Sequence, residues 1–230
     1  MDESLDSLVR QVRRRIELER SFGVSFDWGG RATAGNGEDD VAEAGSKADR
    51  LAALEQEMAD CHACPLGKTR TNLVFGAGSA EADLVFVGEA PGQDEDEQGI
   101  PFIGRAGQLL TKIIESGMKM DRGDVYICNI LKCRPPKNRN PLPTEMFTCM
   151  PYLERQLEII QPRVICCLGG IAAKALLNTD DAVGRLRGVW HDWRGIPLMV
   201  TYHPAYLLRN PSGKAKVWSD IKQVIAKLAE

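Results

Sequence analysis

Short apolar runs alternate with segments of helical periodicity along most of this sequence. Four runs predict β-strands, since each is short, apolar and bounded by turn-forming residues. They span residues 84–87, 125–131, 164–168 and 198–201. Helices are predicted at 104–117, 144–161, 171–177 and along the stripe Trp218, Ile221, Val224, Ile225 and Leu228. Repeated alternation of strand and helix is typical of α/β proteins, so we expect a three-layer α/β/α sandwich with a central parallel sheet.

The first 46 residues follow a different pattern. Residues 5–22 predict an amphipathic helix, whereas residues 29–46 are mainly Gly, Ala, Asn and acidic residues with almost no large apolar side chain. Such a composition buries too little surface to offset the entropy of ordering, so we expect a flexible linker. We therefore divide the chain into a helical extension (1–28), the linker, and a main domain (47–230) that opens with a helix at 48–59.

Charge is unevenly distributed along the chain. Residues 1–60 hold eight Lys and Arg against fourteen Asp and Glu, whereas residues 61–230 hold 21 against 18. The second part includes two basic clusters that could neutralise phosphates, unless they are merely solvated loop faces. They are Lys132, Arg134, Lys137 and Arg139, and Arg209, Lys214 and Lys216. Without a long apolar run or a signal-peptide pattern, we expect a cytoplasmic protein with no membrane partner and no disulfides.

Four of the seven cysteines have a spacing that suggests metal ligation. Cys61 and Cys64 form a C-x2-C pair, whose two thiolates can face one ion, and Cys133 and Cys149 follow far downstream. Fifteen residues separate the second pair, unlike the C-x2-C repeats of a zinc ribbon, and this favours an iron–sulfur cluster. The other cysteines lie in apolar runs and are expected to be small buried hydrophobes. They are Cys128, Cys166 and Cys167.

Three of the predicted strands end in unusual residues. The first is followed by the run Gly88-Glu89-Ala90-Pro91-Gly92, the second carries Asn129, and the fourth runs into His203. Ligands of parallel α/β sheets bind outside the carboxyl ends of the strands, so these residues should converge on one site. The glycine run has neither the dinucleotide fingerprint nor the P-loop pattern, so a nucleotide cofactor is not indicated.

Each of these residues also has a purely structural interpretation. The glycine run could be an ordinary turn, and Asn129 could cap a turn instead of reading the polar edge of a pyrimidine. Phe102, in a polar loop, could plug the edge of the domain or stack on a base. His203 could be structural or, at a strand end before Pro204, a hydrogen-bond donor. The pattern alone leaves these alternatives open.

Four segments of the sequence resemble the family 4 uracil-DNA glycosylases. They are residues 88–96, 99–110, 129–136 and 203–209. The resemblance covers about residues 58–229 and includes the four spaced cysteines. It implies an α/β/α fold and a [4Fe-4S] cluster on Cys61, Cys64, Cys133 and Cys149. It also implies a monomer that flips uracil out of single- or double-stranded DNA and hydrolyses its N-glycosidic bond, leaving an abasic site.

The resemblance implies roles for individual residues. Phe102 would stack on uracil, Asn129 would read its polar edge and His203 would hydrogen-bond its O2. The other implied substrate-site residues are Glu89, Ala90, Gly92 and Asn138. Glu95 would lie near the attacking water or the C5 side of the base, which makes Glu89 and Glu95, with His203, the catalytic candidates. On the DNA side, Leu207 or Leu208 would wedge into the gap, and the implied backbone contacts are Arg134 and Arg209.

One departure from the wider superfamily bears on mechanism. Family 1 enzymes carry a water-orienting aspartate where this sequence has Ala90. A leaving-group mechanism would need little activation of water, since donors such as His203 would stabilise the charge that develops on uracil. The alternative function is a non-catalytic iron–sulfur nucleic-acid-binding or polymerase-associated module. Such a module would not need Phe102, Asn129 and His203 together.

Overall fold

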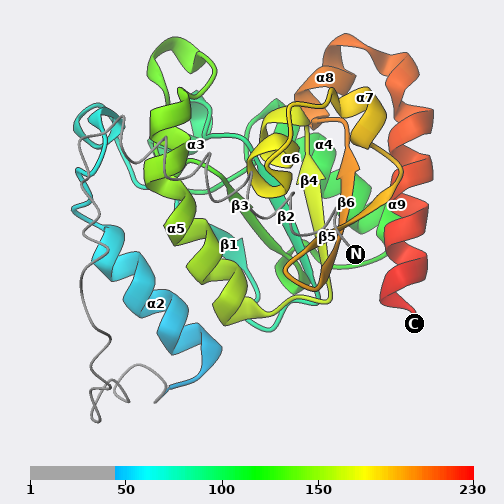
Figure 1. The fold of residues 1–230 in the computed structure, drawn as a ribbon, viewed down its shortest axis with the longest axis horizontal. Helices are drawn as coiled ribbons and strands as arrows, with labels where there is room; N and C mark the ends of the chain where they lie inside the picture. Colours follow the sequence, from blue (N-terminus) through cyan, green and yellow to red (C-terminus); the bar gives the residue numbers. More distant parts are fainter. Residues whose placement is uncertain (1–44) are drawn as a thin grey trace, which may run out of the picture. The chain divides into compact units, whose positions relative to one another are not determined.

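The computed structural model describes residues 45–230, which belong to one compact unit bounded at Glu43–Glu230 (Figure 1). The predicted helix at 5–22 and nearly all of the predicted linker at 29–46 lie outside the described residues. Within residues 45–230, no helix is both long enough and apolar enough to cross a membrane.

A six-stranded sheet lies at the centre, in the order β1-β3-β2-β4-β6-β5. The strands are β1 (Ala77–Gly78), β2 (Leu84–Gly88), β3 (Tyr126–Asn129), β4 (Val164–Leu168), β5 (Trp190–Trp193) and β6 (Ile196–Thr201). The predicted parallel sheet is confirmed for β3, β2, β4 and β6. The whole sheet is mixed, because β1 and the short β5–β6 hairpin supply antiparallel edges.

Helices cover both faces of this sheet (Figure 1). One face carries α2 (Lys47–Met58), α5 (Pro143–Ile160), α6 (Gly170–Leu177) and α7 (Val183–Leu186). The other carries α4 (Arg105–Lys112), the π-helical segment η2 (Ile113–Met118), α8 (Pro204–Arg209) and α9 (Lys214–Leu228). The short elements are η1 (Pro65–Lys68), α3 (Gln93–Gln98), η3 (Arg122–Asp124), η4 (Pro136–Asn138) and η5 (Pro211–Gly213). The predicted three-layer sandwich is confirmed.

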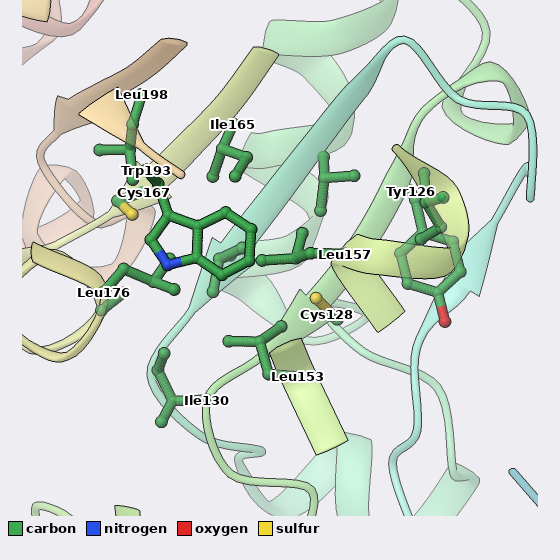
Figure 2. Close-up of a cluster of buried hydrophobic side chains, with 14 of the residues drawn as sticks. Tyr126, Cys128, Ile130, Leu153, Leu157, Ile165, Cys167, Leu176, Trp193 and Leu198 are labelled. Carbon is green, nitrogen blue, oxygen red and sulfur yellow. The ribbon is translucent and has the colours of Figure 1, made fainter. Parts of the chain in front are cut away.

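Strand alternation divides the core into two layers, since successive side chains of a strand point to opposite faces. Val85, Ile165 and Leu198 pack with α2, α5 and α6, whereas their neighbours Phe86 and Cys166 pack with α4 and α9. Figure 2 shows the first layer, in which the Trp193 ring lies among leucine side chains. The three cysteines expected to be buried hydrophobes are fully buried free thiols, which confirms that prediction. They are Cys128, Cys166 and Cys167.

The apolar stripe predicted for the last helix is wrong at one position. Trp218 on α9 is 42% exposed, whereas Val217, Ile221 and Val224 are buried. The buried stripe therefore includes Val217 in place of its larger neighbour. Trp218 instead lies beside Gly117, where an added Cβ would come within 3.0 Å of the indole ring.

Candidate active site

The carboxyl ends of the parallel strands bring the predicted residues together. Gly88 at the end of β2 is the register partner of Asn129 at the end of β3. Thr201 ends β6 two residues before His203, and its carbonyl accepts from the Gly169 amide across 2.9 Å. An added Cβ on Gly169 would lie 3.1 Å from the His203 Cβ. The predicted convergence of these strand ends on one edge of the sheet is confirmed.

Phe102 is the neighbour that the other site residues share. A Cβ on Gly88 would collide with both Asn129 Oδ1 and the Phe102 ring, so only glycine fits there. The Phe102 ring centroid also lies 5.5 Å from that of His203, with the rings tilted by 35°. The aromatic ring is therefore both part of the core and in contact with the polar residues of the strand ends.

Asn129 has a buried acceptor that is not satisfied. The residue is 1% exposed, and its Oδ1 has no hydrogen-bond partner within residues 45–230. An unpaired buried acceptor costs roughly 1–3 kcal/mol, so such atoms are rare unless they serve a ligand. This oxygen lies close to Gly88 and to the Phe102 ring, and it is the unpaired acceptor among the strand-end residues described above.

A buried polar network beneath the site fixes the main chain of Asn129. Lys132 Nζ donates to the Asn129 carbonyl at 2.8 Å and to Gln156 Oε1 at 2.5 Å. Gln156 Nε2 in turn donates to the Tyr126 hydroxyl and to the Phe75 carbonyl. Lys132 is fully buried, and burial lowers its pKa. Lys132 therefore fits neither interpretation of the basic cluster, since both a phosphate-binding patch and a solvated loop face would place it at the surface.

The Phe102 loop is held in a strained conformation. Phe102 has a left-handed backbone (φ 53°), which costs a non-glycine residue roughly 1 kcal/mol or more. Arg122 Nη2 donates to the carbonyls of Pro101 and Phe102, at 2.8 and 3.1 Å. Gly107 packs so closely on the Phe102 carbonyl that a Cβ there would overlap it. These contacts fix the direction in which the ring points.

Glu95 braces the glycine run against the Phe102 loop. Its carboxylate accepts from the main-chain amides of Gly92 (3.1 Å), Ile103 (3.0 Å) and Gly104 (3.0 Å). The Gly92 amide is thus paired with Glu95, and the role of Gly92 at the substrate stays a prediction. The position of Glu95 relative to an attacking water stays a prediction.

Glu89 and Ala90 occupy the glycine run itself. The Glu89 carbonyl accepts from the Leu131 amide at 3.0 Å, and its half-buried carboxyl group has a pKa raised by burial. Ala90 packs against the apolar cluster that contains Cys133 and Cys149. The glycine run therefore joins the strand ends to the cysteine region.

His203 is held as a neutral imidazole. Its Nδ1 accepts from the Ala205 main-chain amide at 3.1 Å, which places the ring proton on Nε2. Part of its surface remains accessible, but the protein packed around the ring lowers its pKa to about 4, and the positive charge of Arg209 adds to this. Extended geometry before Pro204 sets up this cap on α8. Nε2 can therefore donate a hydrogen bond throughout the neutral pH range.

The DNA-contact residues proposed from the sequence differ in exposure. Leu207 is buried in the core at 1% exposure, whereas Leu208 is 41% exposed. Because Leu207 is buried, Leu208 is the leucine whose side chain is accessible to a ligand, as is the exposed side chain of Arg209. On the other loop, Arg134 Nε donates to Asn138 Oδ1 at 2.7 Å, and exposed Asn138 has a left-handed backbone.

The four spaced cysteines come from three parts of the domain, the segment after α2, the loop after β3 and α5, and they lie near one another. Cys133 and Cys149 share an apolar cluster with Cys64 packed against it. Burial raises the pKa of Cys133, and Cys61 is near enough to add to this shift. All are free thiols. Arg70 Nη1 donates to Cys133 Sγ at 3.2 Å and to the Cys61 carbonyl at 3.2 Å. Burial raises the pKa of Cys149 to about 11.

The donor set can be compared with two kinds of metal site. Across the described residues, no three His, Cys, Asp or Glu side chains are arranged to hold a single metal ion. A [4Fe-4S] cluster makes a different demand, because its four thiolates bind four different irons and stand farther apart than the ligands of one ion. Four neighbouring thiols in a largely apolar setting with an Arg donor provide the number and type of ligand that such a cluster requires.

Comparisons with known proteins agree with this geometry. Residues 75–222 match the family described as the Uracil DNA glycosylase superfamily. The chain is 45% identical over 179 residues to a type-4 uracil-DNA glycosylase of Archaeoglobus fulgidus, covering 74% of this chain and 89% of that protein. A type-4 uracil-DNA glycosylase of Thermotoga maritima is 45% identical over 175 residues, with 74% and 90% covered. The corresponding Pyrobaculum aerophilum protein is 42% identical over 179 residues, with 74% and 91% covered.

The chain belongs to the type-4 uracil-DNA glycosylase family. The resemblance carried by the four sequence segments is thereby confirmed, as is the fold that it implied. The sequence did not point to three residues that support this type-4 site. They are Arg122 under the Phe102 loop, Gln156 in the buried network and Arg70 at the cysteines. A signal was present only for the network, since a lysine directly after the apolar run at 125–131 can be drawn into the core and then needs a buried partner.

Proposed function

We propose that this protein removes uracil from DNA by flipping the nucleotide out of the helix and hydrolysing its N-glycosidic bond, which leaves an abasic site. The observation that carries the proposal is the unsatisfied Asn129 Oδ1 beside the Phe102 ring, with the neutral His203 ring 5.5 Å from the same aromatic ring. Relatives of similar length named type-4 uracil-DNA glycosylase support it. They do not favour the alternative of a non-catalytic module.

These residues match the hydrogen-bonding groups of uracil. Uracil offers a planar ring for stacking, an N3–H donor and two carbonyl acceptors. Phe102 would stack on the face, Asn129 Oδ1 would accept from N3–H, and His203 Nε2–H would donate to O2. Cytosine has no hydrogen on N3, so Asn129 would leave that base unpaired and select against it.

The chemistry then follows from the charge on the leaving group. When the C1′–N1 bond breaks, its electron pair moves to uracil and positive charge develops on the sugar. A neutral donor at O2 stabilises the uracil anion without reorganisation, because Nδ1 is already fixed by Ala205. Water adds to C1′ and releases a proton. Glu89, half-buried with a raised pKa, is our candidate to receive it, while Glu95 holds the loop.

We further propose that Cys61, Cys64, Cys133 and Cys149 hold a [4Fe-4S] cluster. When bound, the cluster would supply a four-point cross-link between the start of the domain, the loop after β3 and α5. Arg70 would stabilise the thiolate charge through its hydrogen bond to Cys133 Sγ. Since Ala90 and Leu131 pack in this region, the ligand set would also support the glycine run.

The wider setting is proposed on the same basis. The substrate would be uracil-containing DNA, single- or double-stranded, bound by a monomer in the cytoplasm. Leu208 would fill the space that the flipped nucleotide leaves, and Arg209 and Arg134 would contact phosphates. Asn138 would help to orient the loop that carries Arg134.

The direct test uses end-labelled oligonucleotides that differ at a single base. The protein is incubated with U-containing and matched T-containing DNA, both single-stranded and duplex, and products are cleaved with alkali. We expect release of free uracil and alkali-labile strands from the U substrates alone. Binding of both DNAs without base release would contradict the proposed function and favour a non-catalytic module.

A further inference from the structure

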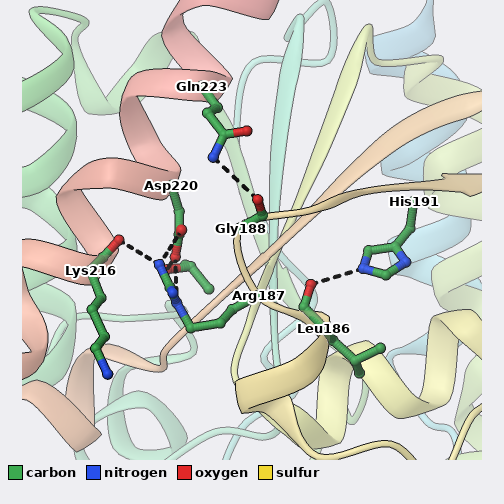
Figure 3. Close-up of polar contacts among 8 residues, drawn as sticks. Leu186, Arg187, Gly188, His191, Lys216, Asp220 and Gln223 are labelled. Carbon is green, nitrogen blue, oxygen red and sulfur yellow. Dashed lines mark hydrogen bonds and ion pairs between the residues drawn. The ribbon is translucent and has the colours of Figure 1, made fainter.

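An ion pair with a buried carboxylate contacts the chain just before His203. Asp220 of α9 is fully buried and accepts from Thr201 Oγ1 at 2.6 Å, at the end of β6. Arg187, after α7, donates to both carboxylate oxygens of Asp220, through Nε at 3.1 Å and through Nη2 (Figure 3). Arg187 Nη2 also donates to the Lys216 carbonyl at 2.8 Å. One guanidinium group thus joins α7, α9 and the end of β6.

The Arg187 guanidinium also contacts Tyr202, the residue after Thr201. Its central carbon lies 5.5 Å from the centroid of the Tyr202 ring, within the range of a cation–π contact. The Tyr202 ring stacks on Tyr206 of α8, with centroids 4.8 Å apart and planes 29° apart. The two tyrosines therefore bracket His203 in the sequence and are packed together in space.

Hydrogen bonds of Gly188, the residue after Arg187, also hold the pair in place. The Gly188 amide donates to the Val200 carbonyl at 3.1 Å, and Gln223 Nε2 donates to the Gly188 carbonyl (Figure 3). Gly188 has a left-handed backbone (φ 71°), and a Cβ there would lie 2.9 Å from Asp220 Oδ1. The chain after Arg187 is therefore shaped to fit closely around the carboxylate.

We propose that Arg187, paired with Asp220, is a positioning residue that fixes the His203 imidazole through Thr201 and Tyr202. This inference rests on the proposed function. Thr201 and Tyr202 are the two residues immediately before His203, and both are held by this pair. Released from it, the His203 loop can shift while α8 remains folded. A displacement of about 1 Å at a catalytic donor can cost roughly a hundredfold in rate.

The test is a double-mutant cycle on single-turnover uracil excision at saturating enzyme. Arg187→Met is compared with the parent, and Arg187→Met/His203→Ala is compared with His203→Ala. If Arg187 acts through His203, its removal slows the parent by roughly tenfold or more and the His203→Ala protein by less than about twofold. Affinity for uracil DNA should stay within a few-fold in all four proteins.

Two further variants keep the test informative. Tyr202→Leu leaves the Arg187–Asp220 ion pair intact, so it can replace Arg187→Met in the cycle if that variant does not fold. It should show the same non-additive loss of rate with His203→Ala. Arg194→Met is the matched control. Like Arg187, Arg194 forms ion pairs with acidic side chains and lies over an aromatic ring, 4.9 Å from the Trp193 centroid. It lies in the turn before β6, at the end of the strand opposite Thr201. The rate of Arg194→Met should be parental.

The outcomes separate the two levels of the proposal. In one outcome, the parent protein releases uracil while Arg187→Met slows excision by the same factor in the parent and in the His203→Ala protein. That result would overturn the positioning role and leave the glycosylase function standing. A parent protein that releases no uracil would overturn both.

Discussion

His203 Nδ1 accepts a hydrogen bond from the Ala205 main-chain amide across 3.1 Å. This contact settles which nitrogen of the ring carries the proton in the neutral form, and Nε2–H is left to act outward. Packing around the ring lowers the pKa of His203 to about 4, so the neutral form persists well below neutral pH. The site therefore presents a neutral donor to a leaving group that becomes negatively charged.

The neutrality of His203 predicts a specific dependence of stability on pH. Its pKa is about 4 in the folded protein against 6.5 for the free group. The unfolded chain therefore binds the proton first as the pH falls, and the fold loses stability from about pH 6.5 down to pH 4. The full loss is up to about 3 kcal/mol.

Urea unfolding at pH 7 and pH 5 measures this effect. Between these pH values the parent should lose about 2 kcal/mol more than His203→Gln, which lacks the titrating group. An equal loss in both proteins would mean that His203 titrates normally in the folded state.

The strained Phe102 loop predicts an unusual sensitivity at Gly107. In Gly107→Ala the new methyl group overlaps the Phe102 carbonyl, which Arg122 holds in place. We expect a destabilisation of roughly 1–3 kcal/mol and slower uracil excision, since the ring must shift. Gly184→Ala is the control, because its Cβ meets nothing within 4 Å. Thermal unfolding and single-turnover rates that are the same in both variants would show that Phe102 is not fixed by this contact.

The cysteine assignment predicts a coloured protein. Purified anaerobically, it should be brown and contain about four irons and four sulfides per chain. Cys133→Ala should lose the colour and the iron, whereas Cys128→Ala should keep both, since Cys128 is a buried core residue. Metal analysis that finds one zinc ion per chain in colourless protein would contradict the cluster.

Local patterns in the sequence predicted the fold and the place of the site well. Parallel strands present their carboxyl ends at one edge, so Gly88, Asn129 and His203 could be brought together from their places at strand ends, without knowing the order of the strands. Side-chain burial was harder to predict. Leu207 and Leu208 are adjacent and chemically alike, and only the packing of α8 decides which one points inward.

Long-range polar partners were not predictable in the same way. Lys132 looked like a surface cation because its partner Gln156 lies 24 residues away on α5. Arg187 and Asp220 are 33 residues apart, and nothing in their local sequence marks them as a pair. Such contacts depend on how helices dock on the sheet, which hydrophobic periodicity does not specify.

The role of His203 in expelling uracil is the central claim, and single-turnover excision by His203→Ala at saturating enzyme tests it most directly. Loss of a donor that acts mainly in the transition state should slow excision by roughly a hundredfold or more, with affinity for uracil DNA within a few-fold of the parent. Arg209→Ala should do the reverse, since it weakens binding and flattens its salt dependence. A His203→Ala protein that excises uracil at the parental rate would contradict the account.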